Sequence, residues 1–117
     1  MKFSNIPIII LTFNRPNHFK RCLDNLITNS IVRDLFISID GPRNINDKKK
    51  QDLIFKIIDK NKKRFNFKIN YLDKNYGCKN GVNKGLDWFF SNVSKGVILE
   101  DDISITSNCL NSFFYLL

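Results

Sequence analysis

Apolar residues recur along this chain with the periods of strands and helices in turn. An unbroken, β-branched run from Ile6 to Thr12 predicts a first strand, in which Pro7 is tolerated near the start. Asn14 is a capping-type residue and Pro16 suits a first helical turn, so we expect a helix to begin there. Its predicted buried stripe has helical spacing and consists of Phe19, Cys22, Leu23, Leu26 and Ile27.

Two further strand and helix units follow. The run Leu35 to Asp40 predicts a second strand, which Gly41 and Pro42 end, and Asn46 or Asp47 is expected to cap the helix after it. In the third strand, residues 65–71, apolar and polar residues alternate, which predicts one solvated face near a sheet edge. The predicted apolar side of the helix between them consists of Leu53, Ile54, Ile57 and Ile58.

The remaining residues predict two helices around a fourth strand. The short apolar run Gly96 to Leu99 is typical of a strand buried on both faces, with a neighbour on each side. Thr106 or Ser107 is expected to cap the last helix. The third helix has Val82, Leu86, Phe89, Phe90 and Val93 as its apolar residues, and the last helix has Leu110, Phe113, Phe114 and Leu117.

The resulting order, β-α-β-α-β-α-β-α, predicts one α/β domain over residues 1–117 with a mostly parallel, Rossmann-like sheet between two helix layers. Right-handed crossovers place the carboxyl end of every strand on one rim of such a sheet. The chain ends on an apolar stretch without a polar tail. We therefore expect either a fragment of a longer chain or a pairing with another copy of itself.

Composition narrows the classes of partner. The formal charge of +8 raises nucleic acid or an anionic membrane surface as a partner, but the basic residues are mostly lysines, which favours neither. The densest runs, residues 48–50 and 60–64, flank one predicted helix and are typical of a solvated face. Three widely spaced cysteines, Cys22, Cys78 and Cys109, give neither a disulfide framework nor a zinc site. We expect a cytoplasmic protein without a transmembrane segment, and leave peripheral contact with a membrane open.

Three consecutive acids follow the fourth strand. Adjacent carboxylates repel one another, and a bound divalent cation would keep Glu100, Asp101 and Asp102 ionised together. Hard oxygen ligands suit Mg²⁺ or Mn²⁺. If the backbone stays extended, Glu100 and Asp102 point to one side and Asp101 to the other. A solvated acidic turn, or acids that cap the next helix, would explain this stretch equally well.

Other polar residues follow the remaining strands. Arg15, beside a helix N-terminus, is placed to meet a phosphate, although it is also compatible with a surface arginine. Asp40 could accept a hydrogen bond from a base or ribose, but an acid that begins a turn is common. The loop from Asn75 to Gly81 could bring its backbone and Lys79 near a ligand, or form only a turn. His18, the single histidine, is expected at the surface, which excludes a Ser-His-Asp triad.

These motifs resemble the nucleotide-sugar-binding half of GT-A-fold glycosyltransferases. The sequence motifs most resemble those of bacterial family-two-like sugar transferases and of the N-acetylglucosaminyltransferase I type. In the latter, the usual D-x-D motif appears as E-D-D. The resemblance covers nearly the whole chain. It is carried by residues 8–16, by residues 38–44, by Asn75-Tyr76-Gly77 with Gly81, Asn83 and Gly85, and by Ile98-Leu99-Glu100-Asp101-Asp102.

The resemblance implies a role for each matching residue. Thr12, Asn14 and Arg15 would form the first loop around the nucleotide, with Arg15 toward the diphosphate. Asp40 would contact the uracil or equivalent base, and the loop from Asn75, with Lys79, would line the nucleotide. Asp101 would reach the ribose hydroxyls, Asp102 would coordinate the metal, and Glu100 would face the donor sugar. The general base of inverting members would lie beyond Leu117.

The resemblance thus implies a metal-dependent hexosyl- or N-acetylhexosaminyltransferase that uses Mn²⁺ or Mg²⁺. Its donor would be a nucleoside diphosphate sugar, and a UDP-sugar is expected, while its acceptor would be a glycan or another hydroxyl compound. The isolated fragment could bind donor without completing transfer. Two alternatives stay open, namely a non-catalytic Mg²⁺-binding module of receiver or nucleotide-binding type and a basic nucleic-acid-binding domain. The acidic rim argues against the nucleic-acid reading.

Overall fold

A four-stranded parallel sheet forms the middle layer of the protein. The computed structural model describes residues 6–28 and 32–102. The strands, in chain order, are β1 (Ile8–Thr12), β2 (Asp34–Ile39), β3 (Asn66–Tyr71) and β4 (Val97–Glu100). They lie side by side in the order β3-β2-β1-β4, and every neighbouring pair is parallel. The predicted Rossmann-like α/β sandwich is therefore confirmed for the described part of the chain.

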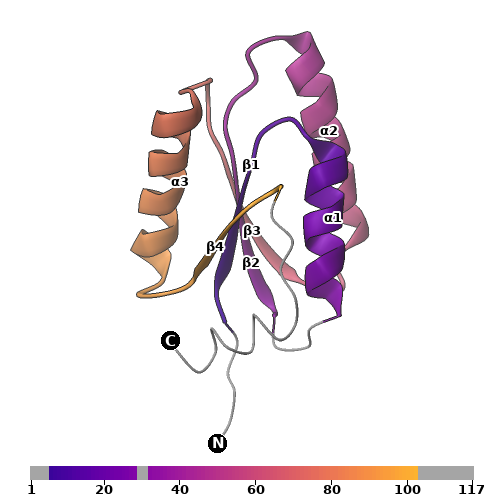
Figure 1. Ribbon diagram of the computed structural model, residues 1–117, viewed down its shortest axis with the longest axis vertical. Helices are drawn as coiled ribbons and strands as arrows, with labels where there is room; N and C mark the ends of the chain where they lie inside the picture. The colour runs from indigo at the N-terminus through magenta and orange to yellow at the C-terminus, as the bar shows by residue number, and fades with distance from the viewer. Residues whose placement is uncertain (1–5, 29–31, 103–117) are drawn as a thin grey trace, which may run out of the picture.

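Helices cover both faces of this sheet. α1 (Pro16–Ile27) and α2 (Ile45–Lys60) lie side by side on one face, and α3 (Cys78–Asn92) lies on the other (Figure 1). The chain moves from β1 to β2 to β3 in one direction and then crosses back to β4 on the far side of β1. Because crossovers of this kind are right-handed, the reversal moves α3 to the opposite face. The carboxyl ends of all four strands consequently meet on one rim.

The core consists of two layers, one on each side of the sheet. On the side of α1 and α2, Ile8 and Ile10 of β1 pack with Phe19 of α1 and Ile54 of α2, all with no exposed surface. On the side of α3, the neighbouring positions Ile9 and Leu11 pack with Phe36 and Phe89. Both faces of β1 and β2 are thus buried, which explains why these strands are continuous apolar runs rather than alternating ones. The predicted core position of Cys22 is confirmed by its 2% exposure.

Strand β4 corrects one prediction from the sequence. It was expected to be buried on both faces, but it lies at one edge of the four-stranded sheet and its burial alternates. Val97 and Leu99 face the α1 and α2 layer, whereas Ile98 is 43% exposed. A four-residue apolar run has no period long enough to reveal this difference. The predicted edge position of β3 is confirmed, and the predicted last helix lies outside the described residues.

The predicted caps were also wrong. Arg15, not Asn14, is the N-cap residue of α1 and makes no side-chain cap hydrogen bond, although Pro16 begins the helix as predicted. Asn44, not Asn46 or Asp47, is the N-cap residue of α2, and its side chain accepts a hydrogen bond from the backbone N–H of Asp47 at 2.9 Å.

Two residues predicted to face the core are instead largely exposed. Leu53 of α2 is 48% exposed and Phe90 of α3 is 45% exposed. Each is an apolar residue beside a helix stripe that does pack inward, through Ile54 and Ile58 in α2 and Phe89 in α3. Counting these apolar residues as core therefore made both predicted stripes wider than the stripes that are buried.

Glycines let α3 approach the sheet closely. A Cβ atom built on Gly85 would lie 2.7 Å from Oγ of Ser38 and 2.9 Å from its Cβ, and one built on Gly81 would lie 2.9 Å from a carboxylate oxygen of Asp40. Both glycines are buried in α3, and Ser38 and Asp40 belong to the end of β2 and the residue after it. The two small residues thus set the distance between α3 and the rim.

We expect Gly85→Ala to destabilise the fold. Alanine in a helix interior normally stabilises by roughly 0.5–1 kcal/mol over glycine, but here the added methyl group must push β2 and α3 apart, which typically costs about 1–3 kcal/mol. Urea unfolding should therefore give a lower free energy of unfolding. Asn83→Ala, at an exposed position of the same helix, is the matched control and should be neutral or stabilising. A stabilised Gly85→Ala variant would contradict the close packing.

Candidate functional site

The strand order reverses between β1 and β4, and this place defines the candidate site. In open α/β sheets, ligands bind in the crevice outside the carboxyl ends of the strands where the order reverses. Here the helix that follows β1 lies on one face of the sheet, and the helix that precedes β4 lies on the other. Thr12 and Arg15 come from the end of β1, and Glu100, Asp101 and Asp102 from the end of β4. The reversal thus brings together residues 86 to 89 positions apart in the sequence.

Asp101 is the buried centre of this group. It is 3% exposed, and its backbone N–H donates to the carbonyl oxygen of Leu11 at 3.2 Å. One carboxylate oxygen accepts a hydrogen bond from Oγ1 of Thr12 and the other from Nη2 of Arg15, each at 2.8 Å. Asp101 therefore holds the Arg15 side chain by a charge-assisted hydrogen bond. In this structure Asp101 is a positioning residue rather than an open ligand.

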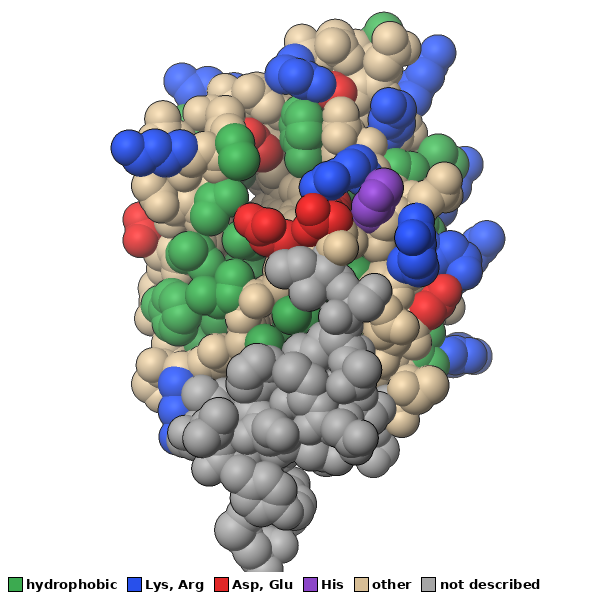
Figure 2. Space-filling model, in the orientation of Figure 1, with side chains coloured by type: hydrophobic (Ala, Val, Ile, Leu, Met, Phe, Trp, Pro, Cys, Tyr) green, Lys and Arg blue, Asp and Glu red, His purple; other side chains and the backbone are tan. Residues whose placement is uncertain are grey.

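Glu100 and Asp102 lie on the outer side of this centre. Both are exposed while Asp101 is buried, but β4 ends at Glu100 and the chain turns at Asp101 and Asp102, so the expected extended backbone does not continue through the three acids. Nη1 of Arg15 lies 4.0 Å from a carboxylate oxygen of Asp102, and the Arg15 side chain is 48% exposed. Figure 2 shows acidic side chains beside a hollow in the middle of this face, next to a basic side chain. Asp101 thus holds the Arg15 side chain on one side, and the other side of Arg15 is open to solvent.

A resident metal site is not complete in the described residues. Among residues 6–28 and 32–102, no three or more His, Cys, Asp or Glu side chains gather closely enough to hold a metal ion. The open carboxylates at the end of β4 are those of Glu100 and Asp102. Two carboxylates are what Mg²⁺ commonly takes from a protein when substrate phosphates supply further ligands.

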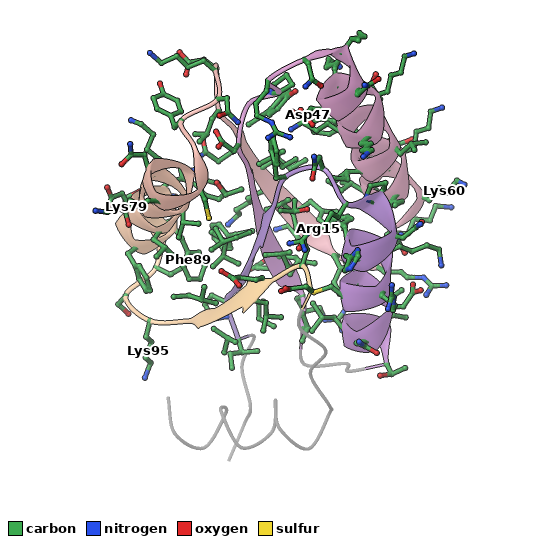
Figure 3. All side chains as sticks on the ribbon, turned by 45° about the horizontal axis from the view of Figure 1, so that its top comes forward. Arg15, Asp47, Lys60, Lys79, Phe89 and Lys95 are labelled. Atoms are coloured by element: carbon green, nitrogen blue, oxygen red, sulfur yellow. The ribbon has the colours of Figure 1, made fainter. Side chains whose placement is uncertain are left out.

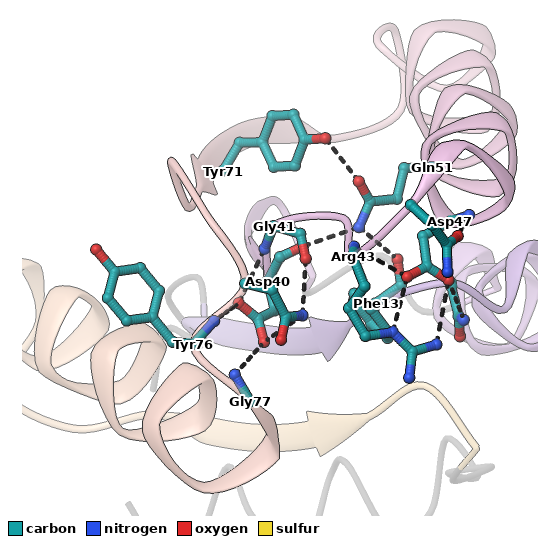
Figure 4. Close-up of polar contacts among 12 residues, drawn as sticks. Phe13, Asp40, Gly41, Arg43, Asp47, Gln51, Tyr71, Tyr76 and Gly77 are labelled. Carbon is teal, nitrogen blue, oxygen red and sulfur yellow. Dashed lines mark hydrogen bonds and ion pairs between the residues drawn. The ribbon is translucent and has the colours of Figure 1, made fainter.

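Asp40 is enclosed by the loop after β3. Its carboxylate accepts hydrogen bonds from the backbone N–H groups of Gly41 and Tyr76, both at 2.9 Å, and of Gly77 at 3.1 Å, with the Asn75 amide at 3.3 Å (Figure 4). A carboxylate has about four lone-pair positions, and these four donors occupy them. The predicted contact of Asp40 with a base would have to displace one of them. In this structure Asp40 anchors the loop that leads into α3.

The predicted loop therefore lies at the rim, with Asn75 bound to β2. The Asn75 side chain also donates to the carbonyl oxygen of Gly41 at 2.8 Å, which ties this loop to the one after β2. Gly77 has φ of 87°, a left-handed conformation that favours glycine, and it is the N-cap residue of α3. Lys79 is exposed in the first turn of α3 (Figure 3). The structure thus places Lys79 on the far layer of the sheet from Arg15.

Gln51 joins the ends of three strands and was not among the predicted site residues. It lies in α2 with no exposed surface, and its side-chain N–H₂ donates to the carbonyl oxygens of Phe13 at 3.0 Å and Asp40 at 2.8 Å. Its side-chain oxygen accepts from the Tyr71 hydroxyl at 2.6 Å. Phe13 follows β1, Asp40 follows β2, and Tyr71 ends β3. The only sequence signal was a polar residue on the inner side of a predicted amphipathic helix.

A second buried acid, Asp47, joins the first two loops. Its carboxylate accepts hydrogen bonds from Nδ2 of Asn14 at 2.9 Å and from Nε of Arg43 at 2.8 Å, and the guanidinium of Arg43 lies 5.1 Å from the Phe13 ring centroid. The hydrogen bonds from Arg43 and then from Asn14 hold the pKa of Asp47 well below its usual range. Asn14, predicted as part of the nucleotide loop, is thus bound to α2. The pair Asn44 and Asp47, spaced as in a capping motif, was the signal that could have found it.

Cys22 lies on the inner, buried face of α1, below the candidate site. Burial raises the pKa of the Cys22 thiol to about 12, and the negative charge of Asp101 adds to that shift. A thiol with this pKa is protonated at neutral pH and is a poor nucleophile. Cys78 is exposed at the start of α3, and His18 is half-buried in α1. Cys22 therefore contributes to the core beneath Asp101 rather than to chemistry at the rim.

The predicted site residues thus form two groups. Thr12, Arg15, Asp101 and Asp102 lie together at the reversal between β1 and β4, with Glu100 beside them. Asp40 and Asn75 are bonded to one another on the other side of β1, at the end of β2, and Asn14 joins α2 through Asp47. All of them belong to one rim, because every strand of the sheet runs in the same direction.

Comparison with known proteins does not identify this chain. No protein-family model matches it, and no curated protein matches it. Among the described residues, no helix is both long enough and apolar enough to cross a membrane. The site is therefore interpreted from its own geometry.

We expect Gln51→Met to destabilise the protein more than Tyr71→Phe. Methionine keeps the length of the side chain but removes both donors, and each buried carbonyl left without its partner costs about 1–3 kcal/mol. Tyr71→Phe removes only the third hydrogen bond. The measurement is the free energy of unfolding in urea for both variants and the wild type. Equal losses would show that the two carbonyl contacts add nothing.

We expect the stability that Asp47 contributes to depend on pH. Because its pKa is lowered in the folded state, this stability is present above the ordinary carboxyl pKa of about 4 and is lost as the pH falls below it. Asp47→Asn should therefore lower the free energy of unfolding near neutral pH, with a difference from wild type that shrinks below about pH 4. Asp52→Asn, on the exposed side of the same helix, should give a smaller difference. A difference for Asp47→Asn that is constant across this range would contradict the assignment.

Proposed function

We propose that this protein binds a nucleoside diphosphate sugar, most suitably a UDP-sugar, and takes part in transfer of the sugar to an acceptor hydroxyl. The observation that carries the proposal is the position of Arg15 and of the acids Glu100 to Asp102 at the reversal of strand order. Such a crevice is where α/β sheets of this type bind nucleotides. The four motifs that resemble GT-A glycosyltransferases all lie on this rim or lead into it.

Arg15 is suited to the diphosphate. Its guanidinium is directed by Asp101 and remains half-exposed, so it can bond to an anion without first being ordered. It is also the N-cap residue of α1, whose first turn carries no acidic residue and no side-chain cap. Backbone N–H groups and the helix dipole favour an anion at such an end. Phosphate oxygens would therefore meet a guanidinium and a helix N-terminus from the same segment.

Glu100 and Asp102 are suited to a divalent cation that binds with the donor. Their carboxylates are exposed, and a diphosphate could supply the ligands that the protein lacks, so the pair fits Mg²⁺ or Mn²⁺. Such a cation, when bound, neutralises charge on the diphosphate leaving group. Asp102, whose carboxylate lies 4.0 Å from Arg15, is the preferred ligand, and the exposed Glu100 would face the donor sugar.

We give two residues other roles than the resemblance implied. Asp101 acts through Arg15 and Thr12, because it is buried and each of its oxygens accepts a hydrogen bond from one of them. Asp40 acts through the loop from Asn75 to Gly77, which would close over the nucleotide. We assign no general base. The strand order also disfavours the receiver-type alternative, in which the first strand lies between the second and third, whereas here β1 lies between β2 and β4.

Calorimetry tests the proposal directly. Titration with a UDP-sugar should show binding in the presence of Mn²⁺ and much weaker binding in the presence of a chelator. Asp102→Ala should weaken the metal-dependent binding at least about tenfold, which corresponds to roughly 1.4 kcal/mol. Arg15→Ala should weaken binding with or without the metal, because it removes a charge-assisted hydrogen bond to phosphate.

Asp87→Ala and Arg21→Ala are matched controls. Both residues are exposed on helices, at α3 and α1 respectively, and removing either changes the net charge as the test variants do. Neither control should alter donor affinity. Equal affinity in chelator would remove the cation from the proposal, and no binding of any nucleoside diphosphate sugar would overturn it.

A further inference from the structure

The outward face of α2 carries an unusual combination of residues. Ile45, Lys49, Leu53, Lys56 and Lys60 are all exposed, and their spacing of three or four positions places them in one stripe along the helix. This stripe lies opposite the inner one, where Asp47, Gln51, Ile54 and Ile58 are buried. We infer that this face docks on an anionic membrane surface, with the lysines at the headgroups and the two apolar side chains between them. The inference is independent of the proposed function.

Positive charge is concentrated around this stripe. Residues 48–64 contain seven lysines and Arg64 against two acids, a net charge of +6 out of +8 for the whole chain. Figure 2 shows Lys and Arg side chains along the edge of the molecule over α1 and α2. Lys60 points away from the sheet at the end of α2 (Figure 3). Most of the excess charge therefore lies on one side of the molecule.

The two acids of this region leave the stripe itself uncompensated. Asp52 pairs with Lys48, and Asp59 pairs with Lys62 at 2.6 Å. Both pairs use lysines outside the stripe. Lys49, Lys56 and Lys60 form no ion pair among the described residues, although Asp52 lies three positions after Lys49 and borders the stripe. Lysines close to an anionic bilayer attract it through its surface potential, over about one Debye length.

The apolar side chains favour a membrane over a nucleic acid. Ile45 is 66% exposed and Leu53 is 48% exposed, and each lies one turn from a lysine of the stripe, Ile45 from Lys49 and Leu53 from Lys49 and Lys56. Aliphatic side chains gain nothing from a phosphate backbone, but they gain from the boundary between headgroups and acyl chains. Lysine can extend its charged end to the headgroups while its stem covers apolar surface. The basic and apolar residues are therefore explained by one partner.

Docking through this face leaves the candidate site accessible. α2 runs along the strands, so a membrane that contacts its outer face lies beside the sheet rather than across the rim (Figure 1). The crevice between β1 and β4 would then open along the membrane surface. No described helix is long and apolar enough to span the bilayer, and docking at its surface requires none.

Co-sedimentation with vesicles tests the inference on the full chain. We expect binding to phosphatidylcholine vesicles that contain phosphatidylglycerol and little binding to pure phosphatidylcholine, at near-physiological ionic strength. Replacing Lys49, Lys56 and Lys60 together by Gln should reduce partitioning on the order of a hundredfold, because each lysine contributes roughly fivefold. Replacing Ile45 and Leu53 by Ser should reduce it roughly five- to tenfold, because partial insertion of both side chains is lost.

A matched control separates this face from general charge. The triple variant Lys74→Gln, Lys79→Gln and Lys84→Gln removes the same charge from the opposite side of the sheet and should retain most of the binding. Unchanged circular dichroism confirms folding in each case. The inference is overturned if anionic vesicles are not bound, if both triple variants lose binding equally, or if the Ser variant binds as wild type. It is also overturned if a DNA or RNA duplex is bound more tightly than the vesicles and that binding is unaffected by the Ser variant.

Discussion

The rim depends on the hydrogen bonds of one buried side chain. Gln51 donates to the residues that follow β1 and β2 and accepts from the last residue of β3, so α2 holds three strand ends in a fixed relation. Parallel strands leave unpaired backbone groups where they end, and burying these without partners is costly. The Gln51 amide satisfies two backbone carbonyls, those of Phe13 and Asp40, and accepts a hydrogen bond from the side-chain hydroxyl of Tyr71. The loops that carry the candidate site begin from these held ends.

Three carboxylates that accept hydrogen bonds within the chain extend this framework, and Asp47 and Asp101 are buried while Asp40 is half-buried. Asp40 accepts hydrogen bonds from N–H groups of the loop before α3. Asp47 accepts hydrogen bonds from both Asn14 and Arg43, and Asp101 accepts one from Arg15. Each replaces water by donors from the chain itself, which is the condition for burying a charge. The rim acids are thus divided by environment into those that hold loops and those that face solvent. Only Glu100 and Asp102 of the candidate group remain open to a ligand.

The two sides of the molecule are chemically different. One side has α1 and α2 with most of the positive charge, and the other has α3, which glycines bring close to β2. The crevice between β1 and β4 lies where these layers separate. An anionic ligand at the rim and an anionic surface beside α2 would each meet positive groups, but through different residues. The two proposals can therefore fail independently.

The sequence by itself determined the elements and their direction. Continuous apolar runs at β1 and β2 predicted buried strands, and the helices between them required parallel neighbours, so the convergence of Thr12, Arg15, Asp40 and the acids on one rim followed from periodicity alone. The burial of Asp101 between exposed Glu100 and Asp102 did not follow in this way, because β4 ends at Glu100 and the chain turns at the next two residues.

Only the tertiary structure decided which polar groups are partners. The inner position of Gln51 and the spacing of Asp47 from Asn44 did not reveal which groups they would bond, and β4 was too short to show that one face is exposed. Asp101 became a buried positioning residue because Thr12 and Arg15 lie at the neighbouring strand end, more than eighty residues away. Periodicity depends on local geometry, whereas hydrogen-bond partners depend on contacts that exist only after the sheet has formed.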